Sequence, residues 1–148
     1  MRALAAMVAL AAAGCGGGDP IPACVTVDPA CTPQLYLPTF HNVYTMTLQT
    51  SCGSQRTSCH AADGAAHLSM ATETEAYVNL LAGRVTAGEP GCSEMIVRVT
   101  SVGASYQMPQ GPASSALTAG AQCSLIHWVA AGAPGPTGDA GVTQEDAP

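Results

Sequence analysis

Six cysteines spread along the central part of the chain constrain its fold more strongly than any other feature. They are Cys24, Cys31, Cys52, Cys59, Cys92 and Cys123, and a seventh, Cys15, precedes them. An even set is typical of exported proteins, whose cysteines pair in an oxidising compartment. Six cysteines allow 15 pairings, and the spacing favours Cys24–Cys31, Cys52–Cys59 and Cys92–Cys123. On the loop-entropy model, such bridges contribute roughly 2.5 to 3.7 kcal/mol each.

The first residues predict export. Arg2 is followed by an apolar run over residues 3–13, which is too short to span a bilayer and is typical of a signal peptide over 1–14. The run ends at Ala-Ala-Gly-Cys15, which resembles the lipobox of bacterial lipoproteins and implies that Cys15 carries lipid. The alternative is an ordinary signal peptide cut nearby. Gly16 resembles an outer-membrane sorting signal, so we expect an exported lipoprotein anchored in the outer membrane, facing the periplasm or the cell surface.

The acidic charge of the chain argues against nucleic acid as a partner. The chain has no Lys, and its four Arg face ten Asp and Glu, for a formal charge of −6, or −7 once Arg2 leaves with the signal. Without a basic patch for phosphate contacts, we expect no nucleic-acid binding. Attraction to anionic lipid is equally poor, so membrane association must come from the lipid on Cys15.

Composition divides the rest of the chain. Residues 15–36 form a Gly-rich tether followed by a lead-in that holds two of the cysteines, and residues 134–148 form a tail of Pro, Gly and acidic residues that we expect to be disordered. Between them, residues 37–133 suffice for one small core.

Helical patterns recur through this central domain. Apolar residues after Thr39 recur at helical spacing and stop at Gly53, Thr72 opens a capping box, residues 92–99 favour a helix, and Thr118 caps a last apolar helix. The prediction is an all-α, disulfide-stapled domain with loops over 55–69 and 103–116.

These two loops carry the residues with recognisable chemistry. One holds Ser58-Cys59-His60 and the other Met108-Pro109. A Cys-His dipeptide with a distant Met is what a c-type haem site needs, namely a thioether cysteine and two axial ligands. Attachment normally uses Cys-x-x-Cys-His, but the position of the first cysteine holds Arg56, and the nearest upstream cysteine is Cys52.

Seven short motifs together resemble a known family. In order they are Thr39-Phe40-x-x-Val43, Ser58-Cys59-His60, Ala76-Tyr77-x-x-Leu80, Cys92-Ser93-x-x-Ile96, Met108-Pro109-x-Gly111, Leu117-Thr118 and Ile126-x-Trp128-Val129-x-x-Gly132-Ala133. They look like the planctomycete-type cytochrome c domain and its relatives in myxobacterial lipoproteins. The resemblance implies a small cytochrome c-like helical domain that binds haem c, with His60 and Met108 as iron ligands and Cys59 as the thioether cysteine. Arg56 departs from the family pattern and leaves the haem-attachment motif degenerate.

Two functional hypotheses follow. In the first, the protein transfers electrons through haem to a redox partner protein. In the second, the scaffold has lost haem, pairs Cys52 with Cys59 as its third disulfide, and acts as a structural or binding lipoprotein. Because Cys59 cannot form both a thioether and a disulfide, the two hypotheses exclude each other. No catalytic motif stands out, so we do not expect an enzyme.

Overall fold

The computed structural model describes residues 19–53, 58–62 and 67–136. The predicted signal peptide, the lipidation site Cys15, the position of Arg56 and the tail beyond residue 136 lie outside the described residues. The regular structure of the described part is helical, which confirms the predicted all-α class. Its elements are α1 (Phe40–Val43), η1 (Tyr44–Cys52), η2 (Ser58–His60), α2 (Glu73–Leu81), η4 (Pro90–Cys92), α3 (Glu94–Thr100), η5 (Ala113–Ser115) and α4 (Ala119–Ala130). The label α marks an α-helix, whereas η1 is a π-helix and the other η elements are short 3-10 helices.

Threonine hydroxyls cap the starts of three helices, two of which, at Thr72 and Thr118, carry caps predicted from the sequence. Each accepts a hydrogen bond from the backbone N–H three residues later, which satisfies one of the unpaired donors of the first turn. The pairs are Thr39–Asn42, Thr72–Glu75 and Thr118–Ala121, at 3.2–3.3 Å. In place of the reciprocal bond of a capping box, in which it would accept from the Thr72 N–H, the Glu75 carboxylate accepts from the Ser69 hydroxyl at 3.1 Å.

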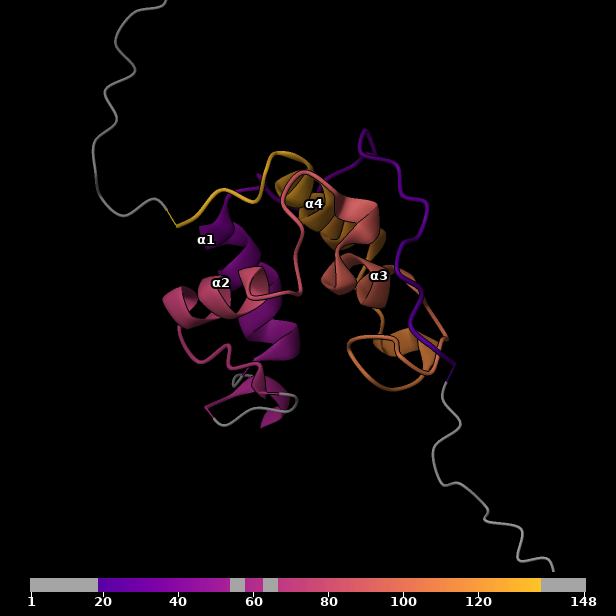
Figure 1. The fold of residues 1–148 in the computed structure, drawn as a ribbon, viewed down its shortest axis with the longest axis horizontal. Helices are drawn as coiled ribbons and strands as arrows, with labels where there is room; N and C mark the ends of the chain where they lie inside the picture. Colours follow the sequence, from indigo (N-terminus) through magenta and orange to yellow (C-terminus); the bar gives the residue numbers. More distant parts are fainter. Residues whose placement is uncertain (1–18, 54–57, 63–66, 137–148) are drawn as a thin grey trace, which may run out of the picture.

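Aromatic side chains join α4 to the N-terminal helices. Trp128 on α4 is fully buried, and its ring centroid lies 5.2 Å from that of Phe40, which in turn lies 5.0 Å from Tyr77 on α2. The indole N–H of Trp128 donates to the carbonyl of Pro134 at 3.0 Å, so the first residue assigned to the tail contacts the core. In Figure 1, α4 covers one end of the molecule with α1 and α3 beneath it. None of the described helices is long and apolar enough to cross a membrane.

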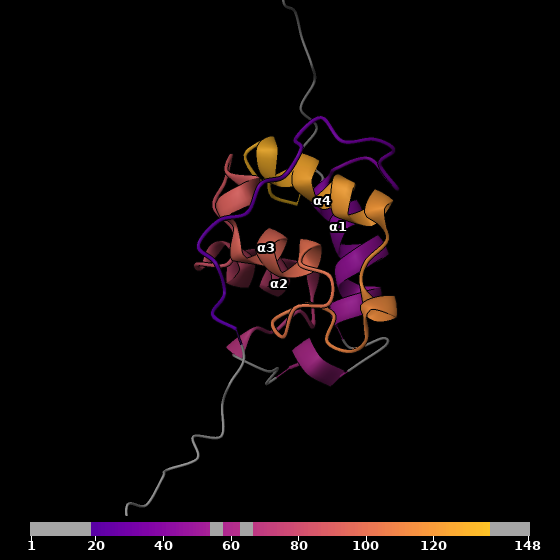
Figure 2. The same cartoon turned by 90° about the vertical axis from the view of Figure 1, so that its right-hand side faces the viewer.

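The lead-in packs on the helices, although the sequence places it outside the domain. Figures 1 and 2 show it in indigo, running along α3 and over α4. The Val25 N–H donates to the Gly91 carbonyl at 2.8 Å, and the N–H groups of Leu35 and Tyr36 donate to the buried Ser124 hydroxyl on α4 at 3.0 and 3.2 Å. This segment is therefore part of the folded unit.

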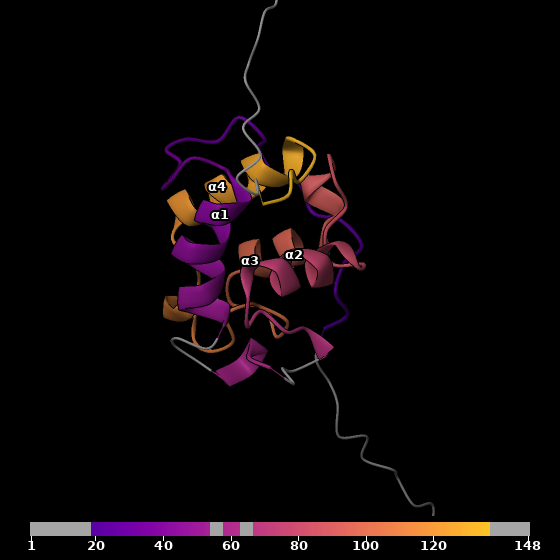
Figure 3. The ribbon, with the colours of Figure 1, turned by 90° about the vertical axis from the view of Figure 1, so that its left-hand side faces the viewer.

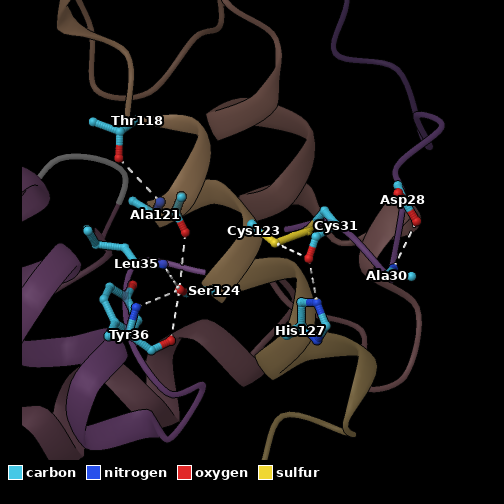
Figure 4. The surroundings of a disulfide bond; sticks show 11 residues. Asp28, Ala30, Cys31, Leu35, Tyr36, Thr118, Ala121, Cys123, Ser124 and His127 are labelled. Atoms are coloured by element: carbon cyan, nitrogen blue, oxygen red, sulfur yellow. Dashed lines mark hydrogen bonds between the residues drawn. A yellow bond between two sulfur atoms is a disulfide. The ribbon is translucent and has the colours of Figure 1, made fainter. Parts of the chain in front are cut away.

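Two disulfides hold the lead-in, and they overturn the predicted pairing. Cys24 pairs with Cys92 and Cys31 with Cys123, over sequence separations of 68 and 92, in place of Cys24–Cys31 and Cys92–Cys123. Figure 4 shows the second bond beside the hydrogen bonds of Ser124. The prediction failed because the lead-in carries its two cysteines to separate helical segments, and a disulfide needs Cα atoms within about 7 Å.

Candidate functional site

The three predicted site residues meet at one cavity. It has a volume of about 200 Å³, and Cys59, His60 and Met108 all line it. The short helix that carries Cys59 and His60, and the loop after α3 that carries Met108, lie toward the same end of the molecule in Figures 2 and 3. Most of the other lining side chains are apolar and come from η1, α2, α3 and α4, such as Leu48, Leu80 and Val99. The fold thus brings together residues that are far apart in sequence.

His60 is held in one tautomer. Its ring is 9% exposed, and its Nδ1 lies 3.1 Å from the carbonyl oxygen of Leu68. A carbonyl only accepts, so Nδ1 is a donor, and in the neutral ring the lone pair lies on Nε2. No hydrogen bond among the described residues occupies Nε2. An imidazole whose other nitrogen donates to a carbonyl is the usual arrangement of a metal-binding histidine.

Backbone contacts fix the position of Met108. Its N–H donates to the carbonyl of Arg98 on α3 at 3.1 Å. The Arg98 guanidinium donates in turn to the carbonyl of Tyr106 at 3.3 Å. The thioether takes no part in these bonds, and Met108 lines the cavity from this anchored loop.

A buried glutamine closes the same loop. Gln107 is 2% exposed, its Oε1 accepts from the Gly103 N–H at 2.6 Å, and its Nε2 donates to the Pro109 carbonyl at 3.0 Å. Both ends of the amide are thus satisfied within the loop, and the residues on either side of Met108 are joined. Sequence reasoning did not find Gln107, because a Gln in a loop gives no signal of burial.

Two thiols share the cavity. Among the described cysteines, Cys52 and Cys59 stay outside the disulfides, so the bond expected between them in a haem-free protein does not form in the structure. Cys59 is exposed at the rim and Cys52 is half-buried at the end of η1. Burial raises the pKa of the Cys52 thiol to about 11, and the nearby Cys59 adds to this rise. Cys52 is therefore a neutral thiol near pH 7.

An ion cluster forms part of the cavity wall. Glu94 accepts from Arg84 at 2.6 Å and from Arg98 at 2.7 Å, and all three residues line the cavity. Burial acts to raise the pKa of the Glu94 carboxyl, but the hydrogen bonds and charges of the two arginines outweigh it and hold this pKa below its usual value. The cluster carries a net charge of +1 in a strongly acidic chain. The scarcity of basic residues is the sequence signal that could have singled out these two arginines.

Two further methionines, Met70 and Met95, line the cavity and are buried. Sequence reasoning did not assign them to the site. Their thioethers are polarisable apolar groups that suit the wall of a cavity for a large planar ligand. Met70 is tied to His60, since its N–H donates to the His60 carbonyl at 2.7 Å.

A second cluster of possible metal ligands lies on the far side of α4. Atoms of Cys31, Cys123 and His127 lie within 4.8 Å of one another. The two sulfurs form a disulfide, and the His127 Nε2–H donates to the Cys31 carbonyl at 3.1 Å, as Figure 4 shows. These groups are therefore explained as structural contacts.

Comparison with protein-family models, curated proteins and solved structures finds no match to the chain.

Proposed function

We propose that this protein is an exported, haem-binding electron-transfer lipoprotein with a cytochrome c-like domain. The observation that carries the proposal is that Cys59, His60 and Met108 line a single cavity. An imidazole and a methionine thioether are the two protein ligands of the iron in a His/Met haem, and a cysteine is the residue type that attaches a c-type haem covalently. The resemblance of the sequence motifs to planctomycete-type cytochrome c domains supports the same assignment.

The residues present fit a haem group. His60 bonds the Leu68 carbonyl through Nδ1 and leaves Nε2 without a hydrogen bond to a described residue, Met108 lines the cavity, and Cys59 is an exposed free thiol. Apolar side chains make up most of the wall, which suits a porphyrin. Arg84 and Arg98, which together with Glu94 carry one net positive charge, would favour the carboxylates of the group.

Bound haem would supply reversible one-electron chemistry, and His/Met ligation raises its reduction potential. The remaining contributions come from the residues of the chain. The Leu68 carbonyl accepts from Nδ1 of His60 and fixes the orientation of the ring, whose Nε2 would hold the iron. The apolar wall would limit the access of water to a bound haem, and the backbone bond of Met108 to Arg98 would limit movement of this residue.

The acidic character of the chain indicates a basic redox partner. Ten acidic residues and three arginines remain once the predicted signal is removed. Opposite charges steer the encounter of electron-transfer proteins and make their association rate sensitive to salt. We place this encounter at a membrane surface, to which lipid on Cys15 would tether the domain.

The test is the visible spectrum and intact mass of the full chain, exported in cells that attach haem to c-type cytochromes. We expect reduced haem bands and the mass of one haem. Replacing His60 with Ala should abolish the low-spin spectrum. His41→Ala is the matched control, because His41 is 66% exposed and bonds Glu73 away from the cavity.

A second pair of variants tests the other ligand. Met108→Ala should lower the reduction potential and remove the sulfur-to-iron absorption band, whereas Met46→Ala, at a 53% exposed position on η1, should change neither. A colourless protein in which Cys52 and Cys59 form a disulfide would refute haem binding and support the haem-free scaffold.

A further inference from the structure

Cys52 has no role in the site as the sequence defines it, yet it faces the same cavity as Cys59. The other described cysteines are consumed by the bonds Cys24–Cys92 and Cys31–Cys123. In an oxidising compartment, a thiol that faces a cavity beside a second thiol is expected to react. Its possible fates are a disulfide with Cys59 or reaction with the ligand that fills the cavity.

The position of Cys52 is set by the helix η1. It is the last residue of the helix η1, and the N–H of the next residue, Gly53, donates to the carbonyl of Leu48 at 2.6 Å. Thr47, Leu48 and Ser51 of the same helix also line the cavity. Cys52 thus presents its thiol from a helix end, while Cys59 presents its thiol from the short helix that also carries His60.

We propose that haem is held by two thioether bonds, one to Cys59 and the other to Cys52, so that Cys52 fulfils the role for which the sequence offers only Arg56. The inference rests on the proposed function and adds a second covalent anchor to it. The sequence argued against double attachment because six residues, rather than two, separate the cysteines. The structure removes this objection, since Cys52 and Cys59 line the same cavity.

The attachment chemistry balances without an oxidant. The reactant is protohaem, which carries two vinyl groups. Each thiol adds across one vinyl group, so that a C–S bond forms at the carbon next to the ring while the carbon–carbon π bond breaks. The thiol hydrogen ends on the outer carbon, which becomes a methyl group. Nothing leaves, so the product has the summed mass of chain and haem, whereas a Cys52–Cys59 disulfide would lose two hydrogens.

The chain offers a direct test because it has no Lys and because Arg56 lies between the two cysteines. Cleavage after arginine therefore places Cys52 on the peptide that ends at residue 56, and Cys59 on the peptide 57–84. The exported full-length protein is denatured, reduced and alkylated before digestion. Reduction opens disulfides but leaves thioethers intact. We expect one haem that joins both peptides, with no alkylated Cys52.

Each other outcome overturns the proposal in a distinguishable way. Haem on peptide 57–84 alone, with Cys52 alkylated, would overturn double attachment and leave the proposed haem function standing. Two haem-free peptides, with both cysteines alkylated after reduction, would overturn the covalent attachment. If the protein also shows no haem bands before denaturation, the proposed function falls with it.

Variants give an independent readout. In Cys52→Ser, haem should remain on peptide 57–84, and the α band of the pyridine haemochrome should move to longer wavelength because one vinyl group stays conjugated. In Cys59→Ser, haem should remain on the Cys52 peptide. Met46→Ala is the matched control, because Met46 lies on the same helix η1 but is 53% exposed, and it should keep both the cross-link and the wild-type band. An unchanged band in Cys52→Ser would also refute the second thioether.

Discussion

The two disulfides should be equally important for stability, although the loops that they close differ in length. The perturbations are the double variants Cys24→Ala/Cys92→Ala and Cys31→Ala/Cys123→Ala. Considered alone, the bonds close loops with sequence separations of 68 and 92, and loop entropy assigns them about 4.4 and 4.7 kcal/mol. In the native protein, however, neither bond acts alone.

The loops overlap in sequence, because Cys31 lies inside the loop that Cys24–Cys92 closes and Cys123 lies outside it. With one bond intact, the shortest path that the other closes runs through the intact bridge and spans about 40 residues, whichever bond is removed. Each double variant should therefore lose about 3.9 kcal/mol. With a urea m-value of about 2 kcal/mol/M, the unfolding midpoint should fall by about 2 M in both.

Urea unfolding of both double variants and the wild type provides the assay, and peptide mapping without reduction provides the control. Cleavage after arginine should leave peptides 85–98 and 99–148 both attached to the peptide that ends at residue 56. Linkage of 85–98 to 99–148 alone would reveal the Cys92–Cys123 pairing that spacing favours, and the structural reasoning would fail. A difference of 2 kcal/mol or more between the variants would refute the overlapping-loop argument.

Three other predictions concern contacts around the site and the lead-in. Glu94→Gln should lose about 1–2 kcal/mol at pH 7 in urea unfolding. Since the folded pKa of Glu94 is lowered, its contribution is complete above pH 4.5 and disappears as the pH falls through the lowered pKa, so equal stability at pH 7 would contradict the ion cluster. Gly91→Ala should lower stability by about 1–3 kcal/mol, because its Cβ would lie 2.5 Å from the Val25 carbonyl oxygen, and an unchanged melting temperature would exclude this close approach. Gln107→Ala should lose about 1–3 kcal/mol and speed hydrogen exchange at the Gly103 amide, and unaltered exchange would show that the amide does not clamp the Met108 loop.

Local patterns predicted the helices well. The hydroxyls of Thr72 and Thr118 cap helices as expected, and the helix predicted after Thr39 begins there, since a cap and the first turn that it satisfies lie within four residues of each other. Residues 92–99, for which the sequence favoured a helix, contain most of α3. These predictions depend on neighbours in the chain and do not require knowledge of the rest of the fold.

The contents of the site were predicted only in part. Cys59, His60 and Met108 were chosen from residue type, order and family resemblance, and the structure places them at one cavity. Cys52 was set aside on spacing, and the cluster of Arg84, Glu94 and Arg98 went unnoticed. Spacing measures distance along the chain, whereas a cavity wall is assembled from segments that packing brings together.

By itself, the sequence determined the helical class, the starts of the capped helices and the three residues that we propose to hold haem, because each depends on short-range pattern or on residue chemistry. The tertiary structure alone decided which cysteines pair, that the lead-in belongs to the folded unit, and that Cys52 faces the candidate site. These features depend on contacts between residues as far apart as Cys31 and Cys123. Such contacts are selected by how the helices bury their apolar faces together, and no local pattern records that choice.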